Sequence, residues 1–117
     1  MEGLGYDFVP RVLDRTDVDE WIKTDDKMSL PMTRRLIREE GMFCGGSSGS
    51  VLGAAIEYCK ANKVGEDKTV VVILADNLRN YITKLVSKEW MVDKKYLEPT
   101  ELIPENHKLK GQPLDIL

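Results

Sequence analysis

The sequence contains little cysteine and no long hydrophobic run. Two cysteines, Cys44 and Cys59, in 117 residues are too few for a disulfide-stabilised scaffold, and they lack the spacing of metal ligands. We interpret both as core thiols. No apolar run approaches the roughly 18 residues that a membrane span requires, and the N-terminus lacks the basic and apolar regions of a signal peptide. We therefore expect a cytoplasmic protein without a membrane partner.

The sequence also lacks a block of basic residues. Its 17 lysines and arginines alternate with 20 aspartates and glutamates, which gives a formal net charge of -3. This pattern excludes the basic surface by which most nucleic-acid-binding domains are recognised, so we expect no DNA or RNA partner. A chain of this length with 42% hydrophobic residues is of the size of one small domain with a single core.

A glycine and serine stretch at residues 42–50 runs directly into an apolar helical pattern at residues 51–59. Glycines allow a backbone to approach a ligand closely, and the following helix directs unpaired N–H groups at the same place. The stretch therefore indicates a binding loop. The alternative is a tight turn formed by Gly45, Gly46 and Gly49, with Ser48 or Ser50 capping the helix. The helix is expected to bury Val51, Leu52, Ala55, Ile56, Tyr58 and Cys59.

Before this loop, the sequence predicts a helix that Asp25, Asp26 or Ser29 caps and that Gly41 ends. Pro31 is tolerated only in the first turn of such a helix. Its expected buried stripe is Met32, Leu36 and Ile37, and its expected solvated face is Arg34, Arg35, Arg38 and Glu39.

After the loop and its helix, residues 69–74 are β-branched and apolar without alternation, which is typical of a parallel strand covered on both faces. Asn77 can cap the next helix, whose expected buried stripe is Leu78, Tyr81, Ile82, Leu85 and Val86. Ser87 begins a further short helix through Trp90 and Met91. The order of elements predicts an α/β fold with a parallel sheet flanked by helices.

The predicted sheet is incomplete. One strand is clear, and residues 17–23 fit a strand or a helix equally well. A single buried strand needs neighbours on both edges, so we expect the chain to be part of a larger fold. The glycine-rich loop that follows Met1 is an unusual start for a domain and supports this expectation. Residues 1–96 are expected to belong to one domain, and residues 97–117, which are rich in proline, to form an extended tail or linker.

Several motifs resemble the cystathionine β-synthase family in register from residue 2 to about residue 98. They are EGLGYDFVP at 2–10, VLDR at 12–15, EGMFCGGSSGS at 40–50, VVILAD at 71–76 with RNY at 79–81, and KEWM at 88–91. The resemblance covers only the C-terminal part of that family's catalytic domain. It implies a fragment of a fold-type II pyridoxal-phosphate enzyme, with the tail leading toward a regulatory domain.

The resemblance implies a β-replacement reaction, in which L-serine and L-homocysteine give L-cystathionine during cysteine biosynthesis. The family's cofactor-binding serine matches Ser47, which follows Gly45 and Gly46. A neutral hydroxyl leaves the pyridine nitrogen unprotonated, and the weaker electron sink favours loss of the β-hydroxyl.

Further positions are assigned by the same resemblance. Glu2, Gly3 and Tyr6 match a loop at the mouth of the active site and are candidate substrate contacts. Asp76 follows the predicted strand, where open α/β sheets bind ligands, or it is a capping acid. Ser48 stands where relatives often have alanine, and we expect that change to be harmless. Ala75 replaces a frequent proline and is expected to loosen the backbone.

The family's Schiff-base lysine, its phosphate-binding loop and its haem ligands match no part of this sequence. The resemblance implies a parent enzyme that binds pyridoxal phosphate and assembles as a homo-oligomer. The parent can also carry a haem, which this segment is not expected to bind. Without the lysine, we expect the isolated chain to be inactive.

Three alternatives remain open. Cysteine synthases, which use O-acetylserine and sulfide, are close relatives of the same family. Residues 45–49 also satisfy G-x-S-x-G, the nucleophile motif of α/β-hydrolases, with Asp76 and His107 following in the required order. A non-catalytic α/β module that binds an anion at the glycine loop is the third alternative.

Overall fold

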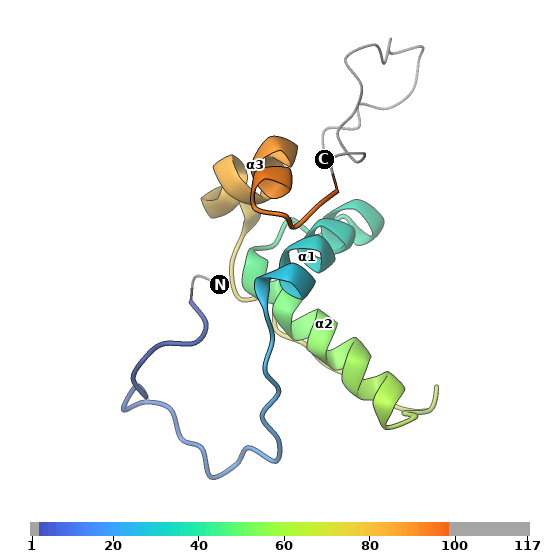
Figure 1. Cartoon of the computed structure of the whole chain (residues 1–117). Coiled ribbons are helices and arrows are strands. Elements are labelled where there is room, and N and C mark those ends of the chain that lie inside the picture. The colour runs from blue at the N-terminus through green and yellow to red at the C-terminus, as the bar shows by residue number, and fades with distance from the viewer. Residues whose placement is uncertain (1–2, 99–117) are drawn as a thin grey trace.

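A computed structural model describes residues 3–98 of the chain, and the elements in that range are all helical. They are α1 (Asp26–Glu40), α2 (Gly46–Ala61), the 3-10 helix η1 (Leu78–Tyr81), the π-helix η2 (Ile82–Val86) and α3 (Lys88–Asp93). Helices α1 and α2 pack on each other, and η2 contacts both α1 and α3 (Figure 1). Within the described range, no helix combines the length and the apolar character needed to cross a bilayer.

The ends of α1 follow the capping chemistry that the sequence predicts. The Asp25 side chain accepts a hydrogen bond from the Met28 N–H at 2.9 Å, and Gly41 adopts a left-handed φ of 69° at the C-terminus. Glycine reaches this conformation without the steric cost that a side chain imposes. The position of Pro31 differs from the prediction, because it lies inside α1 beyond the first turn.

Small residues allow α1 and α2 to approach closely. A Cβ added at Gly49 would overlap the Ser29 carbonyl oxygen and would lie 2.6 Å from the Thr33 nitrogen. Two buried hydrogen bonds join the helices: the Thr33 hydroxyl donates to the Gly46 carbonyl at 3.2 Å, and the Ser50 hydroxyl donates to the Ser29 hydroxyl at 2.7 Å. The start of α2 is therefore fixed against the middle of α1.

The apolar core lies between α1 and the helical segments after residue 77. It consists of Leu30, Ile37, Leu78, Leu85 and Met91, and Tyr81, Val86, Trp90, Tyr96 and Leu97 pack against it. The caps of the C-terminal segments are as predicted. The Asn77 side chain accepts from the Arg79 N–H at 2.9 Å, and the Ser87 hydroxyl accepts from the Trp90 N–H at 3.1 Å.

The predicted solvated face of α1 is wrong at one residue. Arg34 is only 7% exposed, and its Nη1 donates to the carbonyls of Leu85 at 2.7 Å and Val86 at 3.3 Å. These carbonyls lie at the end of η2, where helix geometry leaves acceptors without intrahelical donors. Arg34 therefore holds η2 against α1.

Two predicted buried stripes are only partly correct. In the segment after Asn77, Ile82 is 57% exposed, because the chain forms a 3-10 turn and then a π-helix, which changes the period that places side chains. On α2, Val51 and Tyr58 are exposed at 39% and 40%. The predicted buried residues Leu52, Ala55, Ile56 and Cys59 are half-buried.

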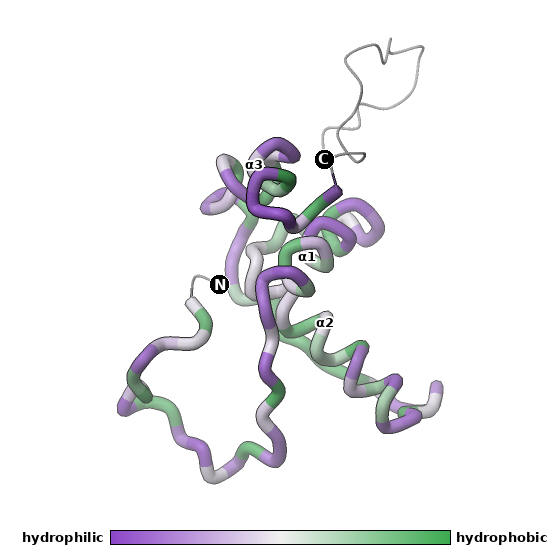
Figure 2. Tube along the Cα trace, viewed as in Figure 1, coloured by the Kyte–Doolittle hydropathy of each residue, from purple (hydrophilic) through white to green (hydrophobic). Residues whose placement is uncertain are grey.

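Residues 69–74 do not form the predicted strand. The segment is extended, and the side chains of Val71 and Ile73 are 85% and 75% exposed. Figure 2 shows it as a hydrophobic stretch of backbone outside the helices. The described residues contain one isolated antiparallel bridge, between Cys44 and Asn77, so the predicted parallel sheet is not confirmed. The physical reason is that no other described segment offers an edge with which this one can pair.

The N-terminal segment, residues 3–25, contains neither a helix nor a strand. The ambiguous residues 17–23 are exposed and form neither the strand nor the helix that their pattern allows. The segment forms a wide loop that extends away from the helices (Figure 1).

Candidate functional site

The glycine and serine stretch forms the start of α2 rather than a loop before it. Gly45 is the N-cap residue, and no side chain caps the helix. The prediction that Ser48 or Ser50 caps α2 is therefore wrong, since both lie inside the helix. The N–H of Gly45 donates to the Asp76 carbonyl at 3.0 Å, which ties this turn to the end of residues 69–76. The N–H groups of the first turn of α2 and the positive end of its dipole meet at this point.

Ser47 lies in the first turn of α2 and is half-buried, between buried Gly46 and fully buried Ser48. Its hydroxyl makes no hydrogen bond with any residue between 3 and 98. A half-buried hydroxyl at a helix N-terminus can donate to a ligand nitrogen or accept from a ligand donor.

Asp76 and Tyr81 form one wall beside this turn. The Tyr81 hydroxyl donates to Asp76 Oδ2 at 2.6 Å, and a Cβ added at Gly45 would overlap Asp76 Oδ1 and lie 2.6 Å from the Tyr81 ring. Any side chain at position 45 would therefore force Asp76 and Tyr81 to shift. Asn77 caps η1, so the interpretation of Asp76 as a capping acid is wrong. Tyr81 was expected only as part of an apolar stripe, and no signal in the sequence indicates its hydrogen bond to Asp76.

Two buried oxygen atoms near the turn have no hydrogen-bond partner among the described residues: Ser48 Oγ and Asp76 Oδ1. Unpaired buried polar atoms are rare in folded proteins. The unpaired oxygen of Asp76, together with the close backbone approach at Gly45, fits a turn that faces a further group. Ser48 is also fully buried.

The predicted substrate contacts lie apart from this turn. Gly3 and Tyr6 line a hollow of about 620 Å³ whose lining residues all fall between 3 and 21. Tyr6 is 63% exposed and stacks on Phe8 at a centroid distance of 5.5 Å. Glu2 lies outside the described residues. The structure thus groups Gly45, Gly46 and Ser47 but does not bring Gly3 or Tyr6 to them.

The hydrolase motif lacks its structural context here. A nucleophile elbow requires a full strand before the serine, whereas a one-residue bridge at Cys44 precedes Gly45 and Ser47 lies within a helix. His107 lies outside the described residues. Cys44 is buried and Cys59 is half-buried, and both are free thiols.

Comparison with known proteins identifies relatives over most of the chain. Residues 1–76 match the model of the family described as pyridoxal-phosphate dependent enzymes. The chain is 54% identical to cystathionine beta-synthase of Dictyostelium discoideum over 99 residues, which cover 85% of this chain and 20% of that protein. It is 52% identical to that of Apis mellifera over 85% of this chain and 19% of the relative. For that of Saccharomyces cerevisiae, the identity is 50% over 78% of this chain and 18% of the relative.

These matches confirm the resemblance that the motifs indicate. The chain spans about a fifth of the length of the curated relatives that it matches. The match to the family model includes the glycine turn, Ser47 and Asp76. The chain therefore belongs to the family of pyridoxal-phosphate dependent enzymes.

Proposed function

We propose that this chain forms the C-terminal part of the catalytic domain of a β-replacement enzyme that joins L-serine to L-homocysteine and produces L-cystathionine. The observation that carries this proposal is the half-buried Ser47 hydroxyl, which has no described partner and lies at the glycine turn that opens α2. The names of the relatives support the choice of reaction.

The residues at the turn suit pyridoxal phosphate. Gly45 and Gly46 present backbone without side chains, so a flat ring can approach them. Ser47 would donate a hydrogen bond to the ring nitrogen and leave that nitrogen without a full positive charge. When bound, the cofactor supplies the electron sink that allows the bond to the β-hydroxyl of serine to break. The neutral partner at position 47 keeps this sink moderate.

The positive end of the α2 dipole reinforces this arrangement. It lies at Gly45 and favours electron density on a group that faces the turn. The Asp76 carboxylate is held by Tyr81 at 2.6 Å, so its negative charge has a fixed position beside Gly45. We propose that Asp76 and Tyr81 set the position of the glycine turn.

The remaining parts of the proposal concern the rest of the protein. We infer that residues 69–74 pair with strands of the same catalytic domain, which would cover the exposed Val71 and Ile73. Glu2, Gly3 and Tyr6 are proposed to approach the substrates in that assembly. We also predict that the parent protein is a cytoplasmic homo-oligomer. Because no lysine here matches the family's cofactor-binding lysine, we propose that the chain alone is inactive.

A chimera tests the proposal. In the Dictyostelium relative, the matched 99 residues are replaced by the corresponding residues of this chain, and the purified chimera is compared with the unmodified relative. We expect the visible absorbance of bound cofactor and the formation of cystathionine from serine and homocysteine. The isolated chain, mixed with the cofactor and the same substrates, should give neither signal.

The alternatives predict different results. A chimera that forms cysteine from O-acetylserine and sulfide, but no cystathionine, would support the cysteine synthase alternative. A folded chimera that lacks visible absorbance would contradict the proposal and favour the anion-binding module. Labelling of Ser47 by a fluorophosphonate in the isolated chain would favour the hydrolase.

A further inference from the structure

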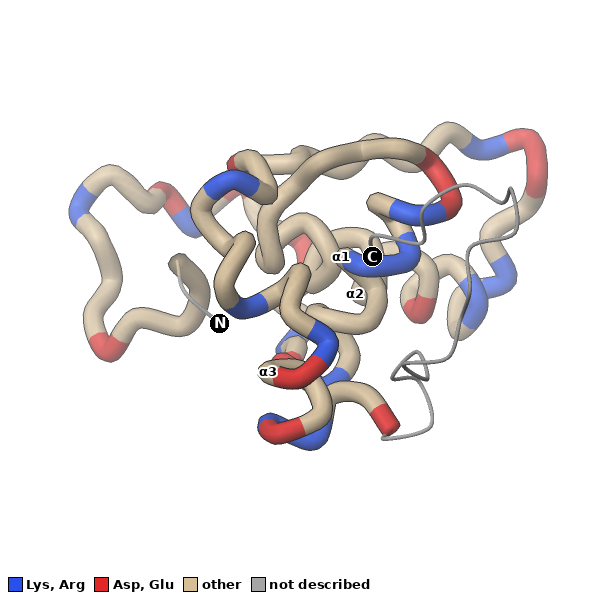
Figure 3. Tube along the Cα trace, turned by 90° about the horizontal axis from the view of Figure 1, so that it is seen from above, with Lys and Arg blue, Asp and Glu red and all other residues tan. Residues whose placement is uncertain are grey.

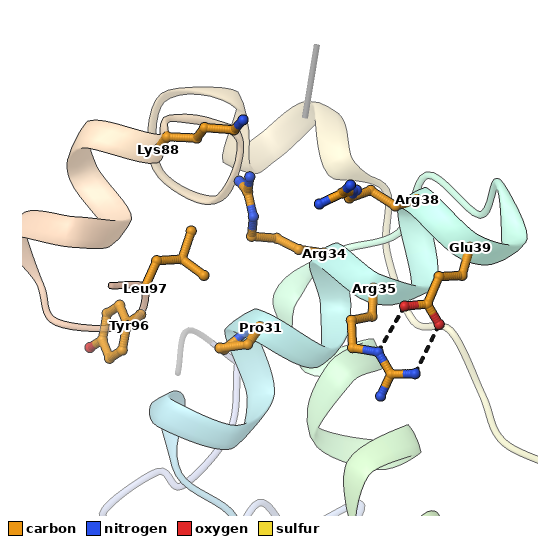
Figure 4. Close-up of a pocket in the computed structure, with 8 residues that line it drawn as sticks. All are labelled: Pro31, Arg34, Arg35, Arg38, Glu39, Lys88, Tyr96 and Leu97. Carbon is orange, nitrogen blue, oxygen red and sulfur yellow. Dashed lines mark hydrogen bonds and ion pairs between the residues drawn. The ribbon is translucent and has the colours of Figure 1, made fainter. Parts of the chain in front are cut away.

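A second hollow lies between α1 and α3, away from the glycine turn. Its volume is about 620 Å³, and its lining residues are Pro31, Arg34, Arg35, Arg38, Glu39, Lys88, Tyr96 and Leu97 (Figure 4). Four of these residues are cationic and one is anionic, although the whole chain has a net charge of -3. Figure 3 shows basic and acidic residues mixed over the rest of the described backbone. The hollow is therefore a local concentration of positive charge.

The single carboxylate of the hollow is already paired. Arg35 donates from Nε and Nη2 to the two oxygens of Glu39, each at 2.9 Å. This hydrogen bonding lowers the pKa of Glu39 and raises the pKa of Arg35. Both side chains are largely exposed, and their charges cancel. The other cations of the hollow are Arg34, Arg38 and Lys88.

Arg34 forms the fixed wall of the hollow. Its side chain is buried and held by the carbonyls of Leu85 and Val86, so its guanidinium cannot move away from neighbouring charges. Arg38 lies one turn further along the same face of α1, because residues four positions apart are neighbours on a helix.

Arg38 and Lys88 approach this wall from two helices. Neither side chain makes a hydrogen bond or an ion pair with any of residues 3–98. Figure 4 shows the charged ends of Arg34, Arg38 and Lys88 turned toward one another. Like charges that share a partly enclosed space repel each other, and an anion between them removes this repulsion.

We propose that this hollow binds a phosphomonoester, with its phosphate between Arg34, Arg38 and Lys88. Guanidinium groups match the geometry of phosphate oxygens, and a lysine adds a compact charge. Pro31, Tyr96 and Leu97 form the less polar side, which suits the organic substituent of the ester. The site is independent of the proposed cofactor site, because none of Gly45, Gly46 and Ser47 lines it.

Tryptophan fluorescence of the chain can report binding. Trp90 contacts Tyr96 at a centroid distance of 5.7 Å, and the second tryptophan, Trp21, lines the separate N-terminal hollow. In a Trp21→Phe background, the emission comes from Trp90 alone, which reports on the hollow through its contact with the lining residue Tyr96. The chain is titrated with inorganic phosphate, phenyl phosphate and phenol. We expect saturable changes with both phosphates, tighter binding of phenyl phosphate, and no saturation with phenol.

Two double variants with the same loss of charge test the location. Arg38→Ala/Lys88→Ala should weaken phenyl phosphate binding by roughly tenfold per cation removed. Lys27→Ala/Lys60→Ala removes two exposed cations that do not line the hollow and should change the affinity less than about twofold. Arg34 is left intact because its replacement would unpair buried carbonyls. Circular dichroism verifies that both variants are folded.

Three results would overturn the proposed anion site itself. They are the absence of saturation with either phosphate, an equal loss of affinity in both double variants, and saturation by phenol. Equal affinities for inorganic phosphate and phenyl phosphate would overturn the assignment to a phosphomonoester. None of these results bears on the chimera experiment, so the two proposals fail separately.

Discussion

Replacing Gly49 by alanine should separate α1 from α2. The added methyl group would overlap the Ser29 carbonyl oxygen and the Thr33 hydroxyl, and it would lie 2.6 Å from the Thr33 nitrogen. Ordinary contacts between a methyl carbon and such atoms exceed about 3.3 Å, so the helices must move apart. Most of the clash is with backbone, which cannot rotate away.

The size of this effect follows from the contacts that would be lost. Overpacking a tight interior costs about 1–3 kcal/mol, and each buried hydrogen bond that breaks costs a further 1–3 kcal/mol or so. Two such bonds join the helices here, from Thr33 to Gly46 and from Ser50 to Ser29. Alanine regains up to about 1 kcal/mol of helix propensity. We expect a net loss of about 2–8 kcal/mol in the free energy of unfolding.

Gly53→Ala is the matched control in the same helix. There the added methyl group meets the side chain of Met28 at 3.1 Å, and this flexible side chain can move. Urea unfolding followed by circular dichroism should give a much lower midpoint for Gly49→Ala and a midpoint near wild type for Gly53→Ala. Thr33→Ala should not rescue Gly49→Ala, because the Ser29 carbonyl stays in place. Equal midpoints for the two glycine variants would refute this account of the packing.

Two further predictions concern side-chain hydrogen bonds. Tyr81→Phe removes the 2.6 Å bond to Asp76 and leaves that half-buried carboxylate without a described donor. It should lower the free energy of unfolding in urea by about 1–3 kcal/mol; an unchanged midpoint would contradict this. The bond from Arg35 holds the pKa of Glu39 below its ordinary value of 4.5. The stabilisation that this pair gives the folded state is therefore present above pH 4.5 and is lost as the pH falls through the lowered pKa. NMR titration of Glu39 should show its pKa rising toward 4.5 in Arg35→Ala, and no rise would refute the assigned cause.

Cap chemistry made the helix ends predictable. Asp25, Gly41, Asn77 and Ser87 act where the sequence indicates, because each cap depends on a few neighbouring residues. The ordered motifs likewise identified the family, since a series of motifs in register is far more specific than one glycine loop.

Features that depend on distant residues were not predictable from local pattern. The local pattern predicts a solvated Arg34 on α1, yet its hydrogen-bond acceptors are the carbonyls of Leu85 and Val86, more than fifty positions later in the chain. The change from a 3-10 helix to a π-helix exposes Ile82. No local sequence pattern indicates this change of helix type. The four-residue spacing of Arg34 and Arg38 was the available signal for the basic hollow.

The extended segment shows a different limit. Residues 69–74 have the composition of a buried strand, and this composition reflects the neighbours that such a strand needs. Among residues 3–98 no neighbour is present, so the segment is extended and exposed. At the candidate site, the residue types alone indicated Ser47, Gly45 and Gly46. The hydrogen bond between Asp76 and Tyr81 became visible only in the structure.

The role of Ser47 is tested most directly in the chimera with the Dictyostelium relative. Ser47→Ala is compared with Ser48→Ala, which removes a neighbouring hydroxyl that has no described partner. We predict that Ser47→Ala lowers kcat for cystathionine formation by about tenfold or more and alters the visible spectrum of the bound cofactor, whereas Ser48→Ala leaves both nearly unchanged. An unchanged kcat and spectrum in Ser47→Ala would contradict the proposed contact with the cofactor.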